Sequence, residues 1–208
     1  MMFSRIVTLT VLATLLLATG FASAQGIPIL DPAVGVKAGV NFSNLDISKA
    51  GTENRTGFVG GAYGQFPFSP YFTIQLEALY SQKGFTKAKL ADLTDWEMKT
   101  SFMEIPLIVR AEIPMPRLKP FFYLGGSWNI LTGSQVKNSD TNNEWVDNDE
   151  GLKSSSFVWV FGLGLKVNNI DIDARINHGK TNLNDDANSD LEIFDRTISL
   201  TVGYAFSL

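Results

Sequence analysis

The last thirteen residues of the chain, Arg196 to Leu208, alternate between apolar and small polar side chains almost without a fault. The apolar positions are Ile198, Leu200, Val202, Tyr204, Phe206 and Leu208, and threonine, serine, glycine and alanine lie between them. A period of two is typical of a β-strand whose two faces meet different surroundings. A strand with one face toward lipid and the other toward a polar lumen has this pattern.

Seven further segments with the same alternation precede it, at residues 34–42, 57–66, 71–83, 101–111, 121–131, 157–167 and 170–178. Each is about nine to thirteen residues long, the length that a tilted strand needs to cross a bilayer. Together with the C-terminal segment they make eight strands, and outer-membrane barrels have even strand numbers. The sequence therefore predicts an all-β fold, a transmembrane eight-stranded antiparallel up-and-down β-barrel, over residues 34–208.

The connections between these segments alternate in length. The short ones are residues 67–70, 113–120 and 168–169, and the long ones are roughly 43–56, 84–100, 132–156 and 179–195. Transmembrane barrels have short periplasmic turns and longer outer loops. A soluble β-sandwich has no reason to sort its loops in this way. We therefore expect the short turns on the periplasmic side and the four long loops outside the cell.

The shortest connection, the Asn-Asn pair at 168–169, fits a two-residue hairpin turn. Asparagine tolerates the positive φ that such a turn needs. Val167 then pairs with Ile170, and Lys166 lies opposite Asp171 with both side chains in the lumen.

Pro106 lies in the middle of the segment 101–111, where it cannot donate a ladder hydrogen bond. We expect a bulge or a local break at this point.

Residues 1–24 have the three parts of a cleavable signal peptide. Arg5 supplies the positive charge, residues 6–17 are apolar, and Ala22-Ser23-Ala24 is a cleavage motif. The sequence predicts export by this cleaved peptide, followed by a linker at 25–33. A retained anchor is the alternative, but the apolar run is short for a membrane-spanning helix.

Composition narrows the possible partners. The chain has no cysteine, so disulfides and thiolate metal sites are excluded. Of 17 basic residues, 16 remain without Arg5, against 21 acidic residues, a net charge of −5. Mild acidity disfavours nucleic acid as a partner.

Aromatic residues on the apolar faces gather toward the two ends of the strands. The predicted periplasmic girdle is Phe66, Phe72, Phe122, Tyr204 and Phe206, and the predicted outer girdle is Phe42, Phe58, Tyr80, Trp128 and Trp159. Two such belts mark the membrane interfaces of outer-membrane barrels. The alternative is a set of core aromatics in a soluble sandwich.

Charged residues fall on the opposite, lumen-facing parity. They are Lys37, Lys83, Arg110, Lys166 and Arg175, against Glu77, Glu104, Asp171 and Asp173. An eight-stranded barrel holds side chains and little else. We interpret the set as an ion-paired network that fills the lumen; a gated ion path is the alternative.

The single histidine, His178, has the lipid-facing parity at the outer end of its segment. Some outer-membrane lipases place a catalytic histidine and serine in such a position. No serine lies in residues 177–181, and a nucleophile needs a base within hydrogen-bond reach. We therefore predict no catalytic residue, no cofactor and no metal ligand.

Two of the long loops are acidic. One contains Asp140, Glu144, Asp147, Asp149 and Glu150 together with Trp145, and the other contains Asp185, Asp186, Asp190, Glu192 and Asp195. A solvated loop surface is the first interpretation. Binding of calcium, or of lipopolysaccharide bridged by a cation, is the alternative, although the full twelve-residue ligand spacing and its terminal glutamate are missing. An exposed tryptophan in such a loop indicates packing on a neighbouring loop or contact with a partner.

Several runs resemble the PorT-type outer-membrane β-barrel family of Bacteroidota-like bacteria. They are residues 35–45 (GVKAGVNFSNL), 56–61 (TGFVGG), 76–84 (LEALYSQKG), 102–107 (FMEIPL), 119–122 (KPFF) and 161–164 (FGLG). The resemblance implies an eight-stranded barrel in the outer membrane. The founding member of that family is associated with type IX secretion, and the family supplies no agreed functional residues.

These observations predict a monomeric, non-catalytic outer-membrane barrel of a Gram-negative bacterium with a structural or surface-binding role. Its predicted partners are membrane lipid and lipopolysaccharide, and a surface or secretion protein through the acidic loops. A component of a PorT-like secretion system and a narrow pore for small solutes are the two alternatives.

Overall fold

The computed structural model describes residues 31–47, 51–90, 93–137, 145–147, 154–179 and 193–207. The predicted signal peptide and most of the predicted linker lie outside these residues. So do the acidic residues Asp140, Glu144, Asp149, Glu150, Asp185, Asp186, Asp190 and Glu192. Asp147 and Asp195 lie in strands, and only their backbone is described.

Nine strands make up the described chain. They are β1 (Ala33–Ile47), β2 (Gly51–Pro67), β3 (Phe72–Leu90), β4 (Leu93–Glu112), β5 (Lys119–Lys137), β6 (Val146–Asp147), β7 (Ser155–Val167), β8 (Ile170–Gly179) and β9 (Ile193–Ser207). None of the described residues forms a helix long and apolar enough to cross a membrane.

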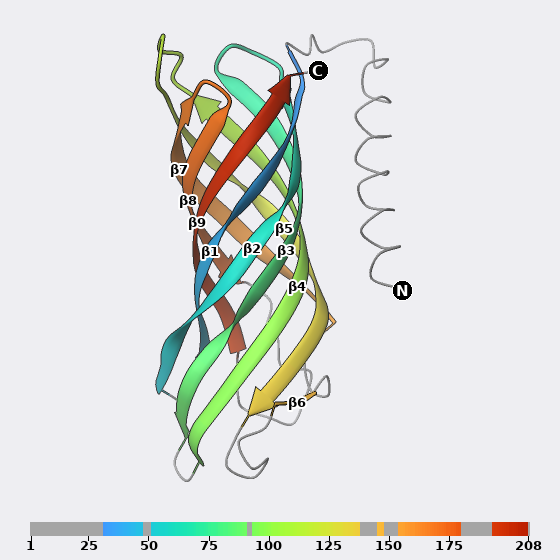
Figure 1. The fold of residues 1–208 in the computed structure, drawn as a ribbon, viewed down its shortest axis with the longest axis vertical. Helices are drawn as coiled ribbons and strands as arrows, with labels where there is room; N and C mark the ends of the chain where they lie inside the picture. Colours follow the sequence, from blue (N-terminus) through green and yellow to red (C-terminus); the bar gives the residue numbers. More distant parts are fainter. Residues whose placement is uncertain are drawn as a thin grey trace.

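Eight of these strands close into one antiparallel barrel (Figure 1). Each pairs with the next along the chain, and the ring closes where β1 pairs with β9 from Ala33↔Ser207 to Ile47↔Ile193. The two-residue β6 pairs only with the end of β5, at Gln135 and Val136. The predicted eight-stranded up-and-down barrel is therefore confirmed.

The strands on one side of the barrel are longer than the hydrophobic alternation indicated. Residues 43–56 and 84–100 were expected to be long loops, but β1, β2, β3 and β4 continue through most of them. Figure 1 shows β2 to β5 extending past β7 and β8 at the lower end of the view. Backbone pairing continues here without alternating apolar residues, because hydrogen bonds between strands do not require an apolar outer face.

Pro106 interrupts the ladder without shifting it. The β3–β4 pairing is continuous up to Leu76↔Leu107 and resumes at Leu79↔Glu104 in the same register. On its other side Pro106 still lies opposite Ser127 of β5. Of the two expected outcomes, a bulge or a local break, the chain has the local break, since proline lacks the N–H that a ladder bond needs.

The connection between β7 and β8 is the expected two-residue turn. Val167 pairs with Ile170, and Asn168 takes a positive φ of 54°. Asn169 ties the turn to β9, because its Nδ2 donates to the carbonyl oxygen of Ala205 at 2.7 Å. Asparagine is suited to this position because its short polar side chain tolerates the left-handed region.

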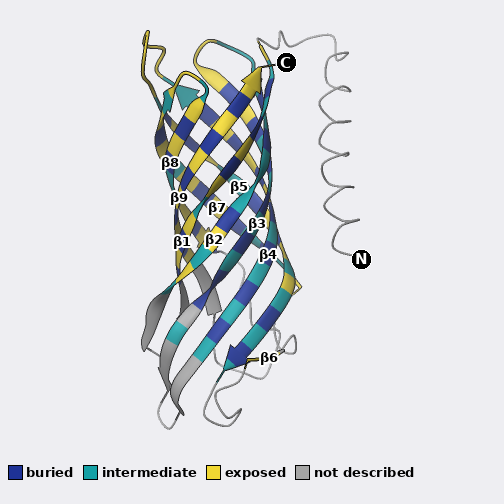
Figure 2. Ribbon diagram, in the orientation of Figure 1, coloured by how far each residue is buried: buried dark blue, intermediate teal, exposed yellow. Residues whose placement is uncertain are grey.

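Burial alternates over most of the described length of the eight barrel strands, as Figure 2 shows in bands of blue, teal and yellow. Inward positions are largely polar and buried, whereas outward positions are largely aliphatic or aromatic and exposed, for example Leu107, Phe122 and Leu163 at 57%, 56% and 65%. The exposed apolar residues continue around the barrel in one band, far larger than the patches of a few hundred Å² on soluble proteins. Such a band fits a lipid surround.

Interior tyrosines pack over glycines of the neighbouring strand. A Cβ added to Gly162 would lie 2.2 Å from the ring of Tyr123, and one added to Gly35 would lie 2.4 Å from the ring of Tyr63. Each glycine therefore makes room for a buried ring that fills the barrel interior. This pairing sets the position of Tyr123 for the contacts described next.

Candidate functional site

Four buried charges meet at the centre of the barrel. Glu77 of β3 contacts Arg175 of β8 at 2.8 Å and Lys37 of β1 at 3.2 Å. Lys37 also contacts Asp173 of β8 at 3.3 Å. Two cations therefore balance two anions, and all four side chains are almost fully buried.

Neutral side chains complete this central cluster. The Tyr123 hydroxyl donates to Asp173 at 2.5 Å and accepts from Nε of Arg175 at 3.1 Å. Thr201 donates to the second oxygen of Asp173 at 2.6 Å. Gln75 donates to Glu77 at 2.5 Å. Buried charges need this kind of saturation, since an unpaired charge in a low-dielectric interior is costly.

A second cluster lies closer to the turn at 168–169. Arg110 of β4 makes a bidentate contact with Asp171 of β8, at 2.7 and 3.2 Å. Nε of Arg110 contacts Glu112 at 2.9 Å, and its guanidinium lies 3.5 Å from the ring centroid of Phe121. Bidentate pairing fixes both position and orientation of the guanidinium.

Lys166 has a different partner from the residue it faces. It is paired in register with Asp171, as the turn predicts. The Asp171 carboxylate, however, is held by Arg110, and Nζ of Lys166 contacts Oε1 of Gln65 at 3.4 Å. Gln65 in turn donates to Asp171 at 3.2 Å, so the lysine is connected to the carboxylate only through an amide.

A further ion pair forms a third charged site, on the other side of the central cluster. Lys83 of β3 and Glu104 of β4 are 2.7 Å apart and fully buried. Lys83 also lies 5.6 Å from the ring centroid of Phe102. At the same end Asn41 donates to the Ser81 hydroxyl at 2.8 Å.

The nine charged residues selected from the sequence are thus all inward, and eight of them are buried while Lys166 is half-buried. Sequence reasoning missed their neutral partners Tyr123, Gln65, Gln75 and Thr201, although their inward parity was readable. It missed Glu112 because the fourth segment was ended one residue too early. The described interior is crossed by ion pairs from wall to wall, and this arrangement can block passage rather than conduct it.

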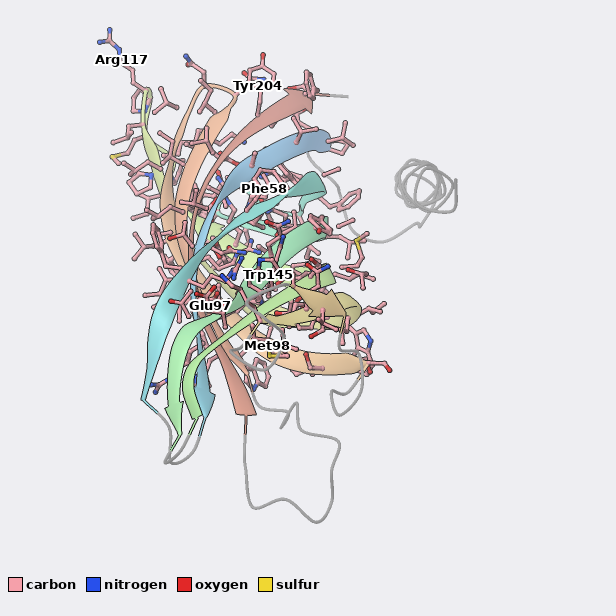
Figure 3. All side chains as sticks on the ribbon, turned by 60° about the horizontal axis from the view of Figure 1, so that its bottom comes forward. Phe58, Glu97, Met98, Arg117, Trp145 and Tyr204 are labelled. Atoms are coloured by element: carbon pink, nitrogen blue, oxygen red, sulfur yellow. The ribbon has the colours of Figure 1, made fainter. Side chains whose placement is uncertain are left out.

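The aromatic residues of both predicted girdles point outward. Phe72 and Phe122 lie in one row across the sheet, each opposite Ala111 of β4. Tyr204 and Phe206 pack edge to face at 4.9 Å between ring centroids. Figure 3 places Tyr204 and the turn residue Arg117 toward the upper end and Glu97, Met98 and Trp145 below them.

Of the outer set, Phe42, Phe58, Trp128 and Trp159 are exposed, while Tyr80 is half-buried and donates to Ser101 at 3.0 Å. Phe66 of the periplasmic set is also half-buried and covers Gly64. On β3, Phe72 and Tyr80 are eight residues apart, about 26 Å along an extended strand. That spacing suits the apolar band of a barrel whose strands are tilted.

His178 lies on the outer face, opposite Trp159 of β7 and Arg196 of β9. It lines a groove of about 410 Å³ with Phe42, Ile176, Arg196 and Ile198, and the inward residues Asn177 and Thr197 complete the lining. No serine is among these described lining residues, and the one hydroxyl in the lining belongs to Thr197, which has the inward parity of β9 while His178 faces outward.

Trp145 contacts a residue of strand β2. Its ring lies 5.3 Å from the guanidinium of Arg55 on β2, and the residue remains 40% exposed. Partial burial lowers the pKa of Arg55 below its usual value, and the charge of Glu97 opposes that shift. Among the described residues no group of acids and histidines is placed to hold a metal ion.

Comparison with solved structures finds several outer-membrane proteins. Solved structures with a similar strand arrangement include Ail, the attachment invasion locus protein of Yersinia pestis (15% identity, 85% of this chain and 100% of that chain, TM-score 0.44). They also include OprG of Pseudomonas aeruginosa (12% identity, 86% of this chain and 98% of that chain, TM-score 0.49). A third is Neisserial surface protein A (14% identity, 83% of this chain and 97% of that chain, TM-score 0.47). At TM-scores below 0.5 and identities of 12–15%, this similarity carries no argument about fold or activity.

A comparison with curated proteins finds no significant match. The sequence does match the family described as outer membrane protein beta-barrel domain over residues 23–185, which is well over half of the chain. With its closed barrel and apolar outer band, the protein therefore belongs to the outer membrane protein beta-barrel domain family.

Proposed function

We propose that this protein is a closed, non-catalytic barrel that anchors a binding surface in the outer membrane. The buried ion-pair network is the observation that supports a closed lumen. Lys37, Glu77 and Arg175 come from three different strands and meet across the interior at 2.8–3.2 Å. An ion or solute would have to break several such contacts to pass.

The strands beyond the outer girdle support a role at the cell surface. On β3 ten residues follow Tyr80, about 33 Å of extended chain. Trp145, packed on Arg55, leaves part of its ring exposed at this end. Exposed aromatic rings are common anchors in protein interfaces.

The proposed orientation has the short turns in the periplasm and the long strands outside, after export by a signal peptide of residues 1–24. We propose the monomer as the active form, in a Gram-negative, Bacteroidota-like cell. Membrane lipid and lipopolysaccharide surround the barrel, and a protein partner binds through the outer end and its acidic loops.

Planar-bilayer recording tests the closed lumen. The purified barrel should give no steady single-channel steps, whereas Glu77→Ala, which breaks the central cluster, should produce conductance. Steady steps from the unaltered protein would establish a narrow pore and contradict the proposal.

The resemblance to PorT-type barrels supports one other role, that of a component of a secretion system. Deletion of the gene followed by measurement of secreted protease tests it. Normal secretion in the deletion strain would leave surface binding as the role.

A further inference from the structure

The outer face of β8 and β9 carries an apolar row and, two residues further along, a row of hydrogen-bonding groups. Phe42, Ile198 and Ile176 are register partners across β1, β9 and β8. Arg196 and His178 are register partners in the next outward-facing row. Successive outward residues are about 7 Å apart along a strand, so the two rows lie side by side.

Both rows line the same groove of about 410 Å³. This volume is within the range of sites that hold small ligands, about 300–1,000 Å³. Phe42, Ile176 and Ile198 are 40–55% exposed, which is unfavourable in water and favourable against a hydrocarbon chain. The groove therefore has an apolar part and a polar part in contact with each other.

The polar part is suited to a phosphate. Arg196 offers a planar guanidinium, the side chain that binds phosphate in a bidentate manner. His178 is directly opposite, with Cβ atoms about 5 Å apart in such a pair, and its imidazole donates a hydrogen bond in either protonation state. Trp159, on the other side of His178, is the type of ring that lies at the headgroup level of membranes.

The position of the groove along the barrel indicates which lipid it contacts. His178 is at the end of β8 opposite to the turn at 168–169, and that end faces the outer leaflet in the proposed orientation. The outer leaflet of a Gram-negative cell is built of phosphorylated glycolipid.

We propose that this groove binds the phosphate and one acyl chain of lipid A, with Arg196 and His178 on the phosphate and Phe42, Ile176 and Ile198 along the chain. The inference rests on the proposed orientation of the barrel.

The test is binding of purified lipid A to the barrel, isolated from outer membranes in mild detergent and delipidated, by native mass spectrometry. One tightly held lipid is expected. Arg196→Gln should weaken its binding about 10- to 100-fold, the range for loss of a charged hydrogen bond. Arg196→Lys should retain part of the affinity, because it keeps the charge and loses the planar donor pair. His178→Gln and Ile198→Ala should each weaken binding less than Arg196→Gln.

Lys99→Gln is the matched control. Lys99 also faces outward near the outer end of its strand, but it follows Glu97 and precedes Ser101 rather than an aliphatic row. Its substitution should leave lipid A binding unchanged. Equal binding by Arg196→Gln and the unaltered protein would overturn the proposal. So would binding of phosphatidylglycerol as tightly as lipid A.

A labelling experiment separates this inference from the orientation on which it rests. The chain has no cysteine, so Arg117→Cys introduces a single thiol on the exposed turn between β4 and β5. An impermeant reagent should leave it unlabelled in intact cells. Labelling from outside would refute the orientation, whereas an unlabelled thiol together with absent lipid A binding would refute the groove alone.

Discussion

Glu77→Gln is the substitution that most directly tests whether the barrel interior is dry. Lys37 and Arg175 are balanced by Glu77 and Asp173, and the four side chains are at most 6% exposed. The substitution removes one anion and leaves one net positive charge in the interior. Removing one partner of a buried ion pair costs about 3–5 kcal/mol, because the remaining charge cannot be solvated. We expect the lower end of this range, since the glutamine oxygen still accepts a hydrogen bond.

The measurement is reversible unfolding by guanidinium chloride in phospholipid vesicles, followed by tryptophan fluorescence. The double variant Lys37→Met/Glu77→Gln restores neutrality and should be more stable than Glu77→Gln alone, with a coupling of about 1–3 kcal/mol. Arg117→Gln, on an exposed turn, is the surface control and should stay within about 0.5 kcal/mol of the unaltered protein.

Two results would refute the reasoning. The first is a free energy of unfolding for Glu77→Gln within about 0.5 kcal/mol of that of the unaltered protein. The remaining positive charge would then be solvated, and the lumen would hold water rather than a sealed network. If the double variant is as unstable as the sum of its two single variants, the two side chains do not interact and the contact is not energetically relevant.

Three other substitutions test local features. Gly162→Ala places a Cβ 2.2 Å from the buried ring of Tyr123 and should cost about 1–3 kcal/mol in the same unfolding assay. Its control is Gly133→Ala, where the new Cβ meets nothing within 4 Å and should have a far smaller effect. Asn168→Ala should lower the free energy of unfolding by about 1–2 kcal/mol, because alanine is disfavoured at a φ of 54°. Asn168→Gly should lower it only slightly, because glycine adopts this φ readily. Trp145→Ala should reduce stability by no more than about 1 kcal/mol, the size of an exposed cation–π contact, and should reduce capture of surface partners by the isolated barrel.

The extent of the strands shows where sequence patterns stop being informative. Inside the membrane the outward residues are largely apolar, so the segments 157–167 and 170–178 match β7 (155–167) and β8 (170–179) to within two residues, whereas 121–131 ends six residues before β5 does. Beyond it, the β3–β4 pairing continues to Leu90↔Leu93 through residues that have no alternating apolar face. Those residues appear as loops in the sequence because their order comes from hydrogen bonds between strands, which leave no hydrophobic period.

The alternation of side chains by itself determined which residues face the interior and which face outward, because neighbouring residues of a strand point to opposite faces. A local turn at 168–169 determined one register, Lys166 opposite Asp171. Which inward charges contact one another was decided only by the closure of the barrel. Arg110 holds Asp171 from 61 residues away, and Arg175 reaches Glu77 across 98 residues. Such contacts depend on how far the strands are staggered when the ring closes, a property of the whole sheet that no single segment contains.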